Sequence, residues 1–155
     1  MQNSSALIVD KIIHRSLKLN CDAHQAFEMF TVNEKLQSWL TELADVEPRV
    51  GGKYELFWNP EDKQYDSTIG CKITAIKEDR FLSFEWKGPK QYNDFMNTAD
   101  PLTHVVVFFI PGDGFTEVQL IHSGWRSSPE WEEARQWFDK MWGWAFAELE
   151  KRINQ

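Results

Sequence analysis

Long apolar runs are scarce in this sequence. The longest is VVVFFI, residues 105–110, which falls far short of the roughly 20 residues that a membrane-spanning helix needs. The N-terminal stretch MQNSSALIVDKIIHRS has no basic region followed by a long apolar segment. We therefore expect neither membrane insertion nor a signal peptide.

Cysteine is also rare. Cys21 and Cys71 stand alone without CxxC spacing, which excludes a disulfide framework and a cysteine-based zinc site. The histidines are isolated as well and show no metal-ligand spacing: His14, His24, His104 and His122. No phosphate loop, nucleophile elbow or paired-carboxylate motif appears. We expect a cytoplasmic protein with reduced thiols, no metal and no cofactor.

Positive charge is in the minority. Seventeen Lys and Arg residues face 24 Asp and Glu residues, for a net charge of −7, and the basic residues are scattered. This balance argues against nucleic acid and against an anionic membrane surface as partners. A chain of 155 residues favours one domain over residues 1–155, with a packed core from about residue 12 to residue 153.

The residues that are present in excess are aromatic. Five of the eight tryptophans fall between Trp125 and Trp144, and three of them lie within WFDKMWGWAF, residues 137–146. Such a density has two readings, an aromatic core or the wall of a cavity. The sequence alone leaves both open.

Hydrophobic periodicity predicts an α+β fold. Alternation predicts a first strand over residues 12–19, and two short helices follow over residues 23–30 and 34–40. Six more strands come in hairpin succession, and a long helix runs from residue 129 to about residue 153. The expected N-caps of the three helices are Asp22, Asn33 and Ser128. Residues 88–101 show no period, so we expect a flexible cover closed by Phe95 and Met96.

The last helix is broadly apolar. Its apolar positions cover roughly 200° of the helical wheel, more than a flat sheet requires. The predicted central positions are Ala134, Phe138, Ala145, Leu149 and Ile153, and a separate flank is formed by Trp137, Met141 and Trp144. A curved sheet folded around the helix would cover both sets, or cover one and leave a gap beside the other.

The strand with the longest apolar run is apolar on both faces. We expect Val105, Val107 and Phe109 to point inward. The intervening side chains of Val106, Phe108 and Ile110 then point outward, which suggests self-association or a partner. Periodicity does not decide which set is buried, and a monomer or a weak homodimer is expected.

Several segments together resemble a known superfamily. These segments are FEMFTVNEKLQSWLT, ADVEPRVGGKYELF, GCKITAIKEDRFLSFEW, TEVQLIHSGW and WGWAFAELE. They resemble the START-like (SRPBCC, helix-grip) superfamily, and in particular the branch related to the C-terminal domain of the heat-shock-protein-90 ATPase activator (AHSA-like). The resemblance implies a seven-stranded curved antiparallel sheet that grips the C-terminal helix around a hydrophobic cavity. It implies no single reaction, because members of the superfamily include lipid carriers, hormone receptors and aromatic cyclases.

Inward-facing positions around this cavity are the candidate ligand contacts. They are Trp39, Tyr54, Trp58, Cys71, Trp86, Phe95, Met96, His122, Trp137, Met141 and Trp144. His122 has three readings: a hydrogen-bonded residue at the sheet rim, a polar group that orients a ligand, or a catalytic group paired with a carboxylate. A buried Cys71 is expected to be inert.

Three functions remain open. The favoured one is binding of a small apolar or aromatic ligand, lipid- or polyketide-like, in the cavity. The second is a co-chaperone or protein-interaction module with a chaperone as partner, and the third is a cyclase- or hydrolase-like enzyme. No catalytic residue is assigned, because no acid or base partner of His122 can be identified from the sequence.

Overall fold

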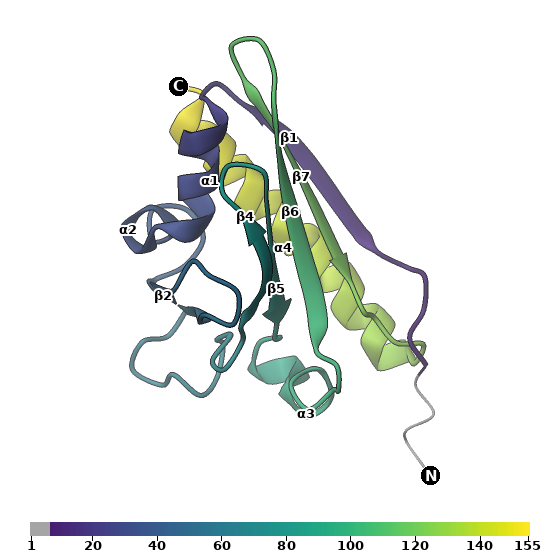
Figure 1. Cartoon of the computed structure of the whole chain (residues 1–155). Helices are drawn as coiled ribbons and strands as arrows, with labels where there is room; N and C mark the ends of the chain where they lie inside the picture. The colour runs from purple at the N-terminus through teal and green to yellow at the C-terminus, as the bar shows by residue number, and fades with distance from the viewer. Residues whose placement is uncertain (1–6) are drawn as a thin grey trace.

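A computed structural model describes residues 7–155 of the chain; residues 1–6, which include part of the stretch considered for a signal peptide, lie outside the described residues. Within these described residues, the fold has seven strands and four α-helices (Figure 1). The strands are β1 (Ile13–Leu19), β2 (Leu43–Val46), β3 (Tyr54–Phe57), β4 (Ile73–Lys77), β5 (Phe81–Trp86), β6 (Thr103–Pro111) and β7 (Thr116–Ser123). The helices are α1 (Ala23–Thr31), α2 (Asn33–Leu36), the 3₁₀ turn η2 (Lys90–Tyr92), α3 (Asn93–Met96) and α4 (Pro129–Ile153).

The strands form two antiparallel sheets. Five strands pair in the order β1-β7-β6-β5-β4, and β2 pairs with β3. The two sheets meet where the Tyr54 N–H donates to the Cys71 carbonyl oxygen at 2.9 Å and the Ile73 N–H donates to the Gly52 carbonyl oxygen at 2.9 Å. The α+β class, the antiparallel pairing and the long C-terminal helix are confirmed. All seven expected strands form, but they divide five and two because β4 begins only at Ile73, after a long connection from β3.

Helix α4 lies behind the five-stranded sheet and crosses it (Figure 1). The Ser128 hydroxyl accepts the Trp131 N–H at 3.3 Å, and Pro129 occupies the first turn, as the sequence predicts. The buried stripe of the helix is Trp131, Ala134, Phe138, Trp142, Phe146 and Leu149. Within residues 7–155, no helix combines the length and apolar character that a membrane crossing requires.

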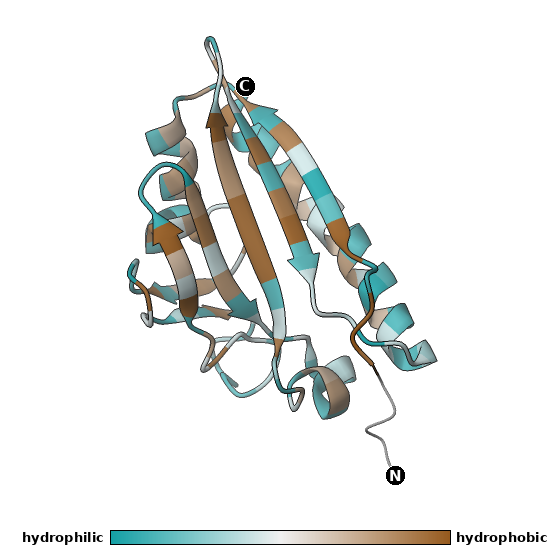
Figure 2. Cartoon of the chain, turned by 45° about the vertical axis from the view of Figure 1, so that its right-hand side comes forward, coloured by the Kyte–Doolittle hydropathy of each residue, from teal (hydrophilic) through white to brown (hydrophobic). Residues whose placement is uncertain are grey.

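Strand β6 is the most apolar strand of the sheet (Figure 2). Val105, Val107 and Phe109 are buried against the helical layer, as expected. Phe108 and Ile110 point to the opposite face and keep 39% and 48% of their surface exposed. Phe109 packs against Phe27 and Phe30 of α1, each at a ring distance of 5.5 Å, which fixes the inward face of the strand. An apolar strip remains on the outer face of the sheet.

Helices α1 and α2 close one end of the fold. Asp22 caps α1 in a reciprocal capping box with Gln25, as expected of an Asp at this position. The predicted cap at Asn33 is wrong: the Asn33 carboxamide oxygen instead accepts the Val46 N–H at 2.9 Å. Asn33 thus joins the first residues of α2 to strand β2, and α2 ends after one turn, at Leu36.

Within residues 88–101, where the sequence led us to expect a flexible cover, residues 90–96 form a 3₁₀ turn and a short α-helix. Tyr92 and Met96, in η2 and α3, are buried. The Asn97 side chain accepts the Gly88 N–H at 2.7 Å and donates to the Gly88 carbonyl oxygen at 3.0 Å. Helices this short have no period to read in the sequence, so their formation depends on these contacts.

Candidate functional site

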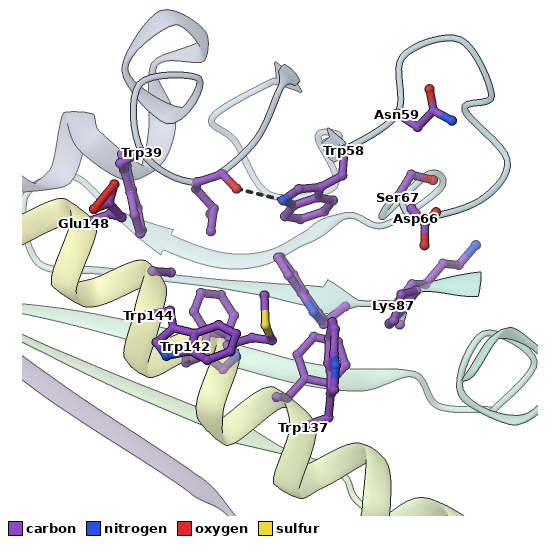
Figure 3. A pocket seen from close by; sticks show the side chains of 17 residues that line it. Trp39, Trp58, Asn59, Asp66, Ser67, Lys87, Trp137, Trp142, Trp144 and Glu148 are labelled. Carbon is purple, nitrogen blue, oxygen red and sulfur yellow. Dashed lines mark hydrogen bonds between the residues drawn. The ribbon is translucent and has the colours of Figure 1, made fainter. Parts of the chain in front are cut away.

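A pocket of about 440 Å³ lies between α4, the end of β5 and the connection from β3 to β4 (Figure 3). Six of the eight tryptophans of the chain line it. Its lining residues are Trp39, Leu40, Trp58, Asn59, Asp66, Ser67, Trp86, Lys87, Gly88, Pro89, Trp137, Phe138, Met141, Trp142, Trp144, Ala145 and Glu148. The volume is within the range of pockets for small molecules, and most of the lining is apolar.

Helix α4 supplies one wall of the pocket. Trp137, Met141 and Trp144 lie one helical turn apart on the flank beside the buried stripe. The predicted flank therefore lines this pocket. Trp144 keeps 66% of its surface exposed, so it stands at the mouth of the pocket. Trp142, one turn after Phe138, lies in the buried stripe and forms the floor.

The opposite wall is made of indole rings from three separate segments. The Trp58 ring lies 6.0 Å from the Trp86 ring in an edge-to-face arrangement, and the Trp86 ring lies 5.2 Å from the Trp142 ring. The indole N–H of Trp58 donates to the Leu40 carbonyl oxygen at 2.8 Å (Figure 3). The indole N–H of Trp39 donates to the Met29 carbonyl oxygen at 2.9 Å. These bonds fix the orientation of the rings that face the pocket.

Polar side chains lie at the two ends of the pocket (Figure 3). Asn59, Asp66, Ser67 and Lys87 lie at one end, and Glu148 lies beside Trp39 at the other. An Asp66 carboxylate oxygen accepts the Lys90 N–H at 2.9 Å, and the Ser67 hydroxyl donates to the Lys63 carbonyl oxygen at 2.7 Å. The pocket is therefore apolar in its middle, with few polar groups that would orient an occupant.

Six of the eleven candidate ligand contacts line this pocket: Trp39, Trp58, Trp86, Trp137, Met141 and Trp144. The other five lie in the packed core or on the far side of it: Tyr54, Cys71, Phe95, Met96 and His122. The Tyr54 hydroxyl donates to the Phe30 carbonyl oxygen at 2.8 Å, which holds its ring away from the pocket. Burial raises the pKa of the Cys71 thiol to about 12, so this cysteine is inert, as expected.

The two residues expected to close the cavity contact other parts of the fold. The Phe95 ring packs against Trp131 at 5.2 Å, edge to face. Met96 is fully buried and lies against Gly88. Gly88 and Pro89 border the pocket in their place. The residue pattern of the segment did not predict these contacts. The turn formed by η2 and α3 directs the side chains of Phe95 and Met96 toward the core and away from the pocket.

His122 lies in the centre of the core, where the sequence suggested the sheet rim. Its ring is fully buried among Trp86, Trp125, Phe138 and Trp142. Nδ1 of His122 accepts the Trp142 indole N–H at 3.1 Å. Since an indole nitrogen only donates, Nδ1 is unprotonated and Nε2 carries the proton that reaches the Thr103 hydroxyl at 3.0 Å.

Burial, with a smaller contribution from the charge of His104, lowers the pKa of His122 to about 3. The imidazole is therefore neutral at pH 7, and both ring nitrogens are already engaged. As arranged, His122 has no nitrogen to offer to a molecule in the pocket. The geometry thus gives no support to a reaction that uses His122 as acid or base.

Sequence reasoning missed several lining residues. Trp142 could have been assigned to the floor, because it follows Phe138 by four positions on the apolar stripe. The lining residues from connections carry no periodic signal: Leu40, Asn59, Asp66, Ser67, Lys87, Gly88 and Pro89. Their position depends on long-range contacts between the two sheets.

One group of possible metal ligands does come together outside the pocket. His24 Nδ1 lies 2.9 Å from the Asp79 carboxylate and 4.0 Å from that of Glu78, and His24 Nε2 lies 3.2 Å from that of Glu28. The hydrogen bond to Asp79 raises the pKa of His24. The cluster lies at the surface and connects α1 to the turn between β4 and β5. It could not be predicted from the sequence, because His24 and the two acidic residues of the turn are far apart in the chain.

Comparison with known proteins assigns the chain to a family. Residues 20–154 match the model of the family described as Activator of Hsp90 ATPase homolog 1-like protein. No curated protein matches the sequence.

Solved structures share the fold at low sequence identity. Protein MLL2253 from Mesorhizobium loti has a TM-score of 0.72 and 18% identity, and the match covers 93% of this chain and 97% of that one. The Aha1 dimer from Colwellia psychrerythraea has a TM-score of 0.71 and 14% identity, covering 92% and 96%. An HSP90 activator from Plasmodium falciparum has a TM-score of 0.53 and 20% identity, covering 73% and 72%. At these identities the likeness shows the fold alone.

Proposed function

The chain belongs to the family of Activator of Hsp90 ATPase homolog 1-like proteins, and we propose that it binds a small apolar or aromatic molecule in the pocket between α4 and β5. The observation that carries this proposal is the gathering of six indole rings from four parts of the chain around about 440 Å³ of space. Planar, rigid side chains of this kind offer a large apolar contact area and lose little conformational entropy on binding. A lipid- or polyketide-like molecule fits such a lining. Cys21 and Cys71 are both free thiols, which suits our expectation of a cytoplasmic protein.

The pocket differs from an imperfectly packed core in how its walls are held. Protein interiors normally close to crystal-like density, because an empty space forfeits dispersion contacts on every side. Here the indole N–H groups of Trp39, Trp58 and Trp142 are each bonded to an acceptor in another part of the fold. These hydrogen bonds fix the orientation of the three rings, so the rings do not turn inward and fill the pocket. A cavity that is held open in this way favours ligand binding over simple packing.

A filling substitution tests the proposal. Ala145 lines the pocket, and Ala147, two positions on, is exposed and does not. We expect Ala145→Phe to weaken binding of the apolar dye N-phenyl-1-naphthylamine at least about tenfold, because the added ring occupies the volume that the dye needs. Ala147→Phe, with the same change in helix propensity, is expected to leave the affinity unchanged.

The measurement is a fluorescence titration of the dye, with circular dichroism to show that both variants are folded. Equal dye affinity in the wild type and in a folded Ala145→Phe variant would show that the dye does not enter the pocket. If the dye does bind in the pocket, native mass spectrometry of protein purified from its own host is expected to identify the natural occupant, and that occupant is expected to displace the dye from the wild type.

A second candidate function is interaction with a chaperone, and the outer face of the sheet favours it. The family description and the name of one structural neighbour refer to Hsp90 activation. Phe108 and Ile110 are exposed on the face of β6 opposite to the buried side chains of Val105, Val107 and Phe109. An apolar strip on an otherwise polar surface is typical of a protein contact, with a chaperone or with a second copy of the chain.

The two candidates are separable by experiment. If the outer face binds the chaperone, Phe108→Ser is expected to abolish co-purification with the host's Hsp90 and any stimulation of its ATPase. Val50→Ser, which changes another exposed apolar side chain, serves as the matched control. Ala145→Phe is expected to leave chaperone binding intact. Absence of an Hsp90 complex with the wild type would remove this candidate, and sedimentation of the same samples reports self-association.

A further inference from the structure

One buried polar group on the pocket wall has no partner. Trp86, the last residue of β5, lines the pocket and is only 3% exposed. Its indole N–H finds no hydrogen-bond acceptor among residues 7–155. The indole N–H groups of Trp39, Trp58 and Trp142, in the same lining, all donate to acceptors. Trp86 is thus the exception in a wall whose other buried indoles are satisfied.

An unpaired buried donor is costly and calls for an explanation. More than about 90% of buried polar groups in native structures are hydrogen-bonded, and an orphaned one is penalised by its lost hydration. The Trp86 ring has little freedom to turn toward another acceptor, since Phe84, Trp58, Trp142 and His122 surround it at ring distances of 5.7, 6.0, 5.2 and 6.4 Å. The partner therefore has to come to the ring. Trp86 borders the pocket, and its N–H is covered in this structure, so an acceptor in the pocket reaches it when an adjoining side chain moves aside.

We propose that the ligand carries an oxygen acceptor, a carbonyl or a carboxylate, that accepts the hydrogen bond of the Trp86 indole N–H. This inference rests on the proposed binding function and narrows its ligand to a class: an apolar, preferably planar body with one acceptor oxygen. Lys87 follows Trp86 directly and also lines the pocket. The positive charge of Lys87 favours binding of a ligand carboxylate at this end of the pocket, so either a carboxylate or a ketone can serve as the acceptor.

Two compounds of nearly equal shape test the class. Fluorene and 9-fluorenone are both flat tricyclic molecules, and only the ketone has an acceptor. Apolar burial alone favours fluorene, because the ketone is better hydrated in water. We expect the wild type to bind 9-fluorenone roughly five- to tenfold more tightly than fluorene, the ratio that one buried hydrogen bond gives. Affinities are measured by displacement of N-phenyl-1-naphthylamine.

Matched variants identify the donor. Trp86→Phe removes the N–H and keeps an aromatic ring, so the preference for the ketone is expected to disappear while fluorene still binds. Trp58→Phe removes an indole from the same pocket whose N–H is already bonded to Leu40; it is expected to weaken both compounds and to preserve their ratio. Fluorene-9-carboxylate shows whether the preferred acceptor is a carboxylate or a ketone. If it is a carboxylate, this compound is expected to bind the wild type more tightly than 9-fluorenone does, and Lys87→Met is expected to remove that gain.

The wild type alone also reports the bond, should Trp86→Phe fail to fold. In a ¹H–¹⁵N spectrum with its eight indole signals, one signal is expected to move downfield with 9-fluorenone and to stay with fluorene. Equal or tighter binding of fluorene by the wild type overturns this inference and leaves the proposed function standing. A preference that survives in folded Trp86→Phe overturns it as well. Failure of both compounds to bind overturns the inference and the proposed function together.

Discussion

At the scale of single residues, His122 connects the core to the pocket. Its ring accepts a hydrogen bond from Trp142 and donates one to Thr103, so the side chain joins α4 to strands β7 and β6. Trp142 also forms the floor of the pocket. The buried imidazole therefore orients the pocket floor without touching the space above it.

The low pKa of His122 makes the stability of the protein depend on pH. In the unfolded chain the imidazole titrates near its ordinary value of 6.5, whereas the folded protein holds it neutral down to about pH 3. Between these values the unfolded state binds more protons, so stability falls as the pH is lowered below about 6.5. From pH 7 to pH 5 the loss from His122 is about 2 kcal/mol.

Urea denaturation at the two pH values checks this expectation. His122→Phe is expected to be less stable at pH 7, because the Trp142 indole N–H loses its acceptor and the Thr103 hydroxyl loses its donor. It is expected to lose about 2 kcal/mol less than the wild type on going to pH 5. The comparison cancels the opposite contribution of His24, whose raised pKa stabilises the fold at low pH and is unchanged in the variant. Equal losses in both proteins would show that His122 is protonated in the fold.

Two aromatic residues of α4 are expected to respond differently to truncation. Phe138 is buried, and Phe138→Ala is expected to cost about 3–5 kcal/mol of unfolding free energy. Trp144 is 66% exposed at the mouth of the pocket, so Trp144→Ala is expected to cost less than about 1 kcal/mol and to weaken binding of the apolar dye. Urea denaturation beside a dye titration decides the matter, and a large loss of stability from Trp144→Ala would place this ring in the core.

At the scale of elements, the Asn97 side chain holds the first half of the segment from Gly88 to Pro101 together. The Asn97 carboxamide makes two hydrogen bonds to the Gly88 backbone and a third, at 3.0 Å, to the Asn93 side chain. The bonded segment places Tyr92 against Trp137, at a ring distance of 5.8 Å, and Gly88 beside the pocket. The segment thus supports one wall of the pocket from outside.

Asn97→Ala is expected to loosen this segment. Loss of the three hydrogen bonds costs about 1–3 kcal/mol of local stability, so amide exchange over residues 89–97 is expected to become about tenfold faster or more. Thr98→Ala, which removes a single exposed hydrogen bond to the Asp94 carbonyl oxygen, is the matched control. Hydrogen exchange read by mass spectrometry makes the comparison, and unchanged protection in Asn97→Ala would mean that packing of Tyr92 and Met96 is sufficient.

The sequence predicted long elements well and short ones poorly. Helix α4 has a serine cap and a proline in its first turn, so its start could be predicted. Its buried side was predicted in part: Ala134, Phe138 and Leu149 are buried, whereas Ala145 and Ile153 are only half-buried. Helix α3 has four residues and no side-chain cap, so nothing local distinguishes it from a loop. Asn33 shows the same limit, since its partner Val46 is distant in the chain and a capping role was the only local reading.

At the scale of the whole molecule, both sheets and α4 share one core. Phe30 from α1 contacts Phe109 of β6 and Phe146 of α4, and Leu56 of β3 belongs to the same buried cluster. The connection of the sheets through this core, in addition to a few backbone hydrogen bonds, predicts that they unfold together.

A urea titration followed at two wavelengths tests this coupling. The far-ultraviolet circular dichroism reports all elements, whereas tryptophan fluorescence reports mainly the pocket and α4, where most of the indoles lie. We expect coincident transitions with one midpoint. A fluorescence change that precedes the loss of secondary structure would mean that the pocket side, with β2 and β3, forms a separate unit.

The family resemblance predicted the overall architecture, whereas the residues that line the pocket could be predicted only in part. The flank of Trp137, Met141 and Trp144 follows from helical spacing, and all three residues line the cavity. The opposite wall depends on where the long connection between β3 and β4 packs, which the sequence pattern does not specify. His122 was misplaced because alternation gives the face of a strand and not the depth of a residue beneath neighbouring aromatic rings.

The row formed by Trp58, Trp86 and Trp142 has a consequence for spectroscopy. Neighbouring ring centres lie 6.0 and 5.2 Å apart, at tilts of 76° and 43°. Transition dipoles at such separations couple, so the three chromophores absorb as an exciton set and produce a signed couplet in circular dichroism. Excitation energy also passes along the row to whichever ring emits. An occupant that turns one indole changes the couplet and the emission of all three, so the protein contains its own optical reporter of an occupied pocket.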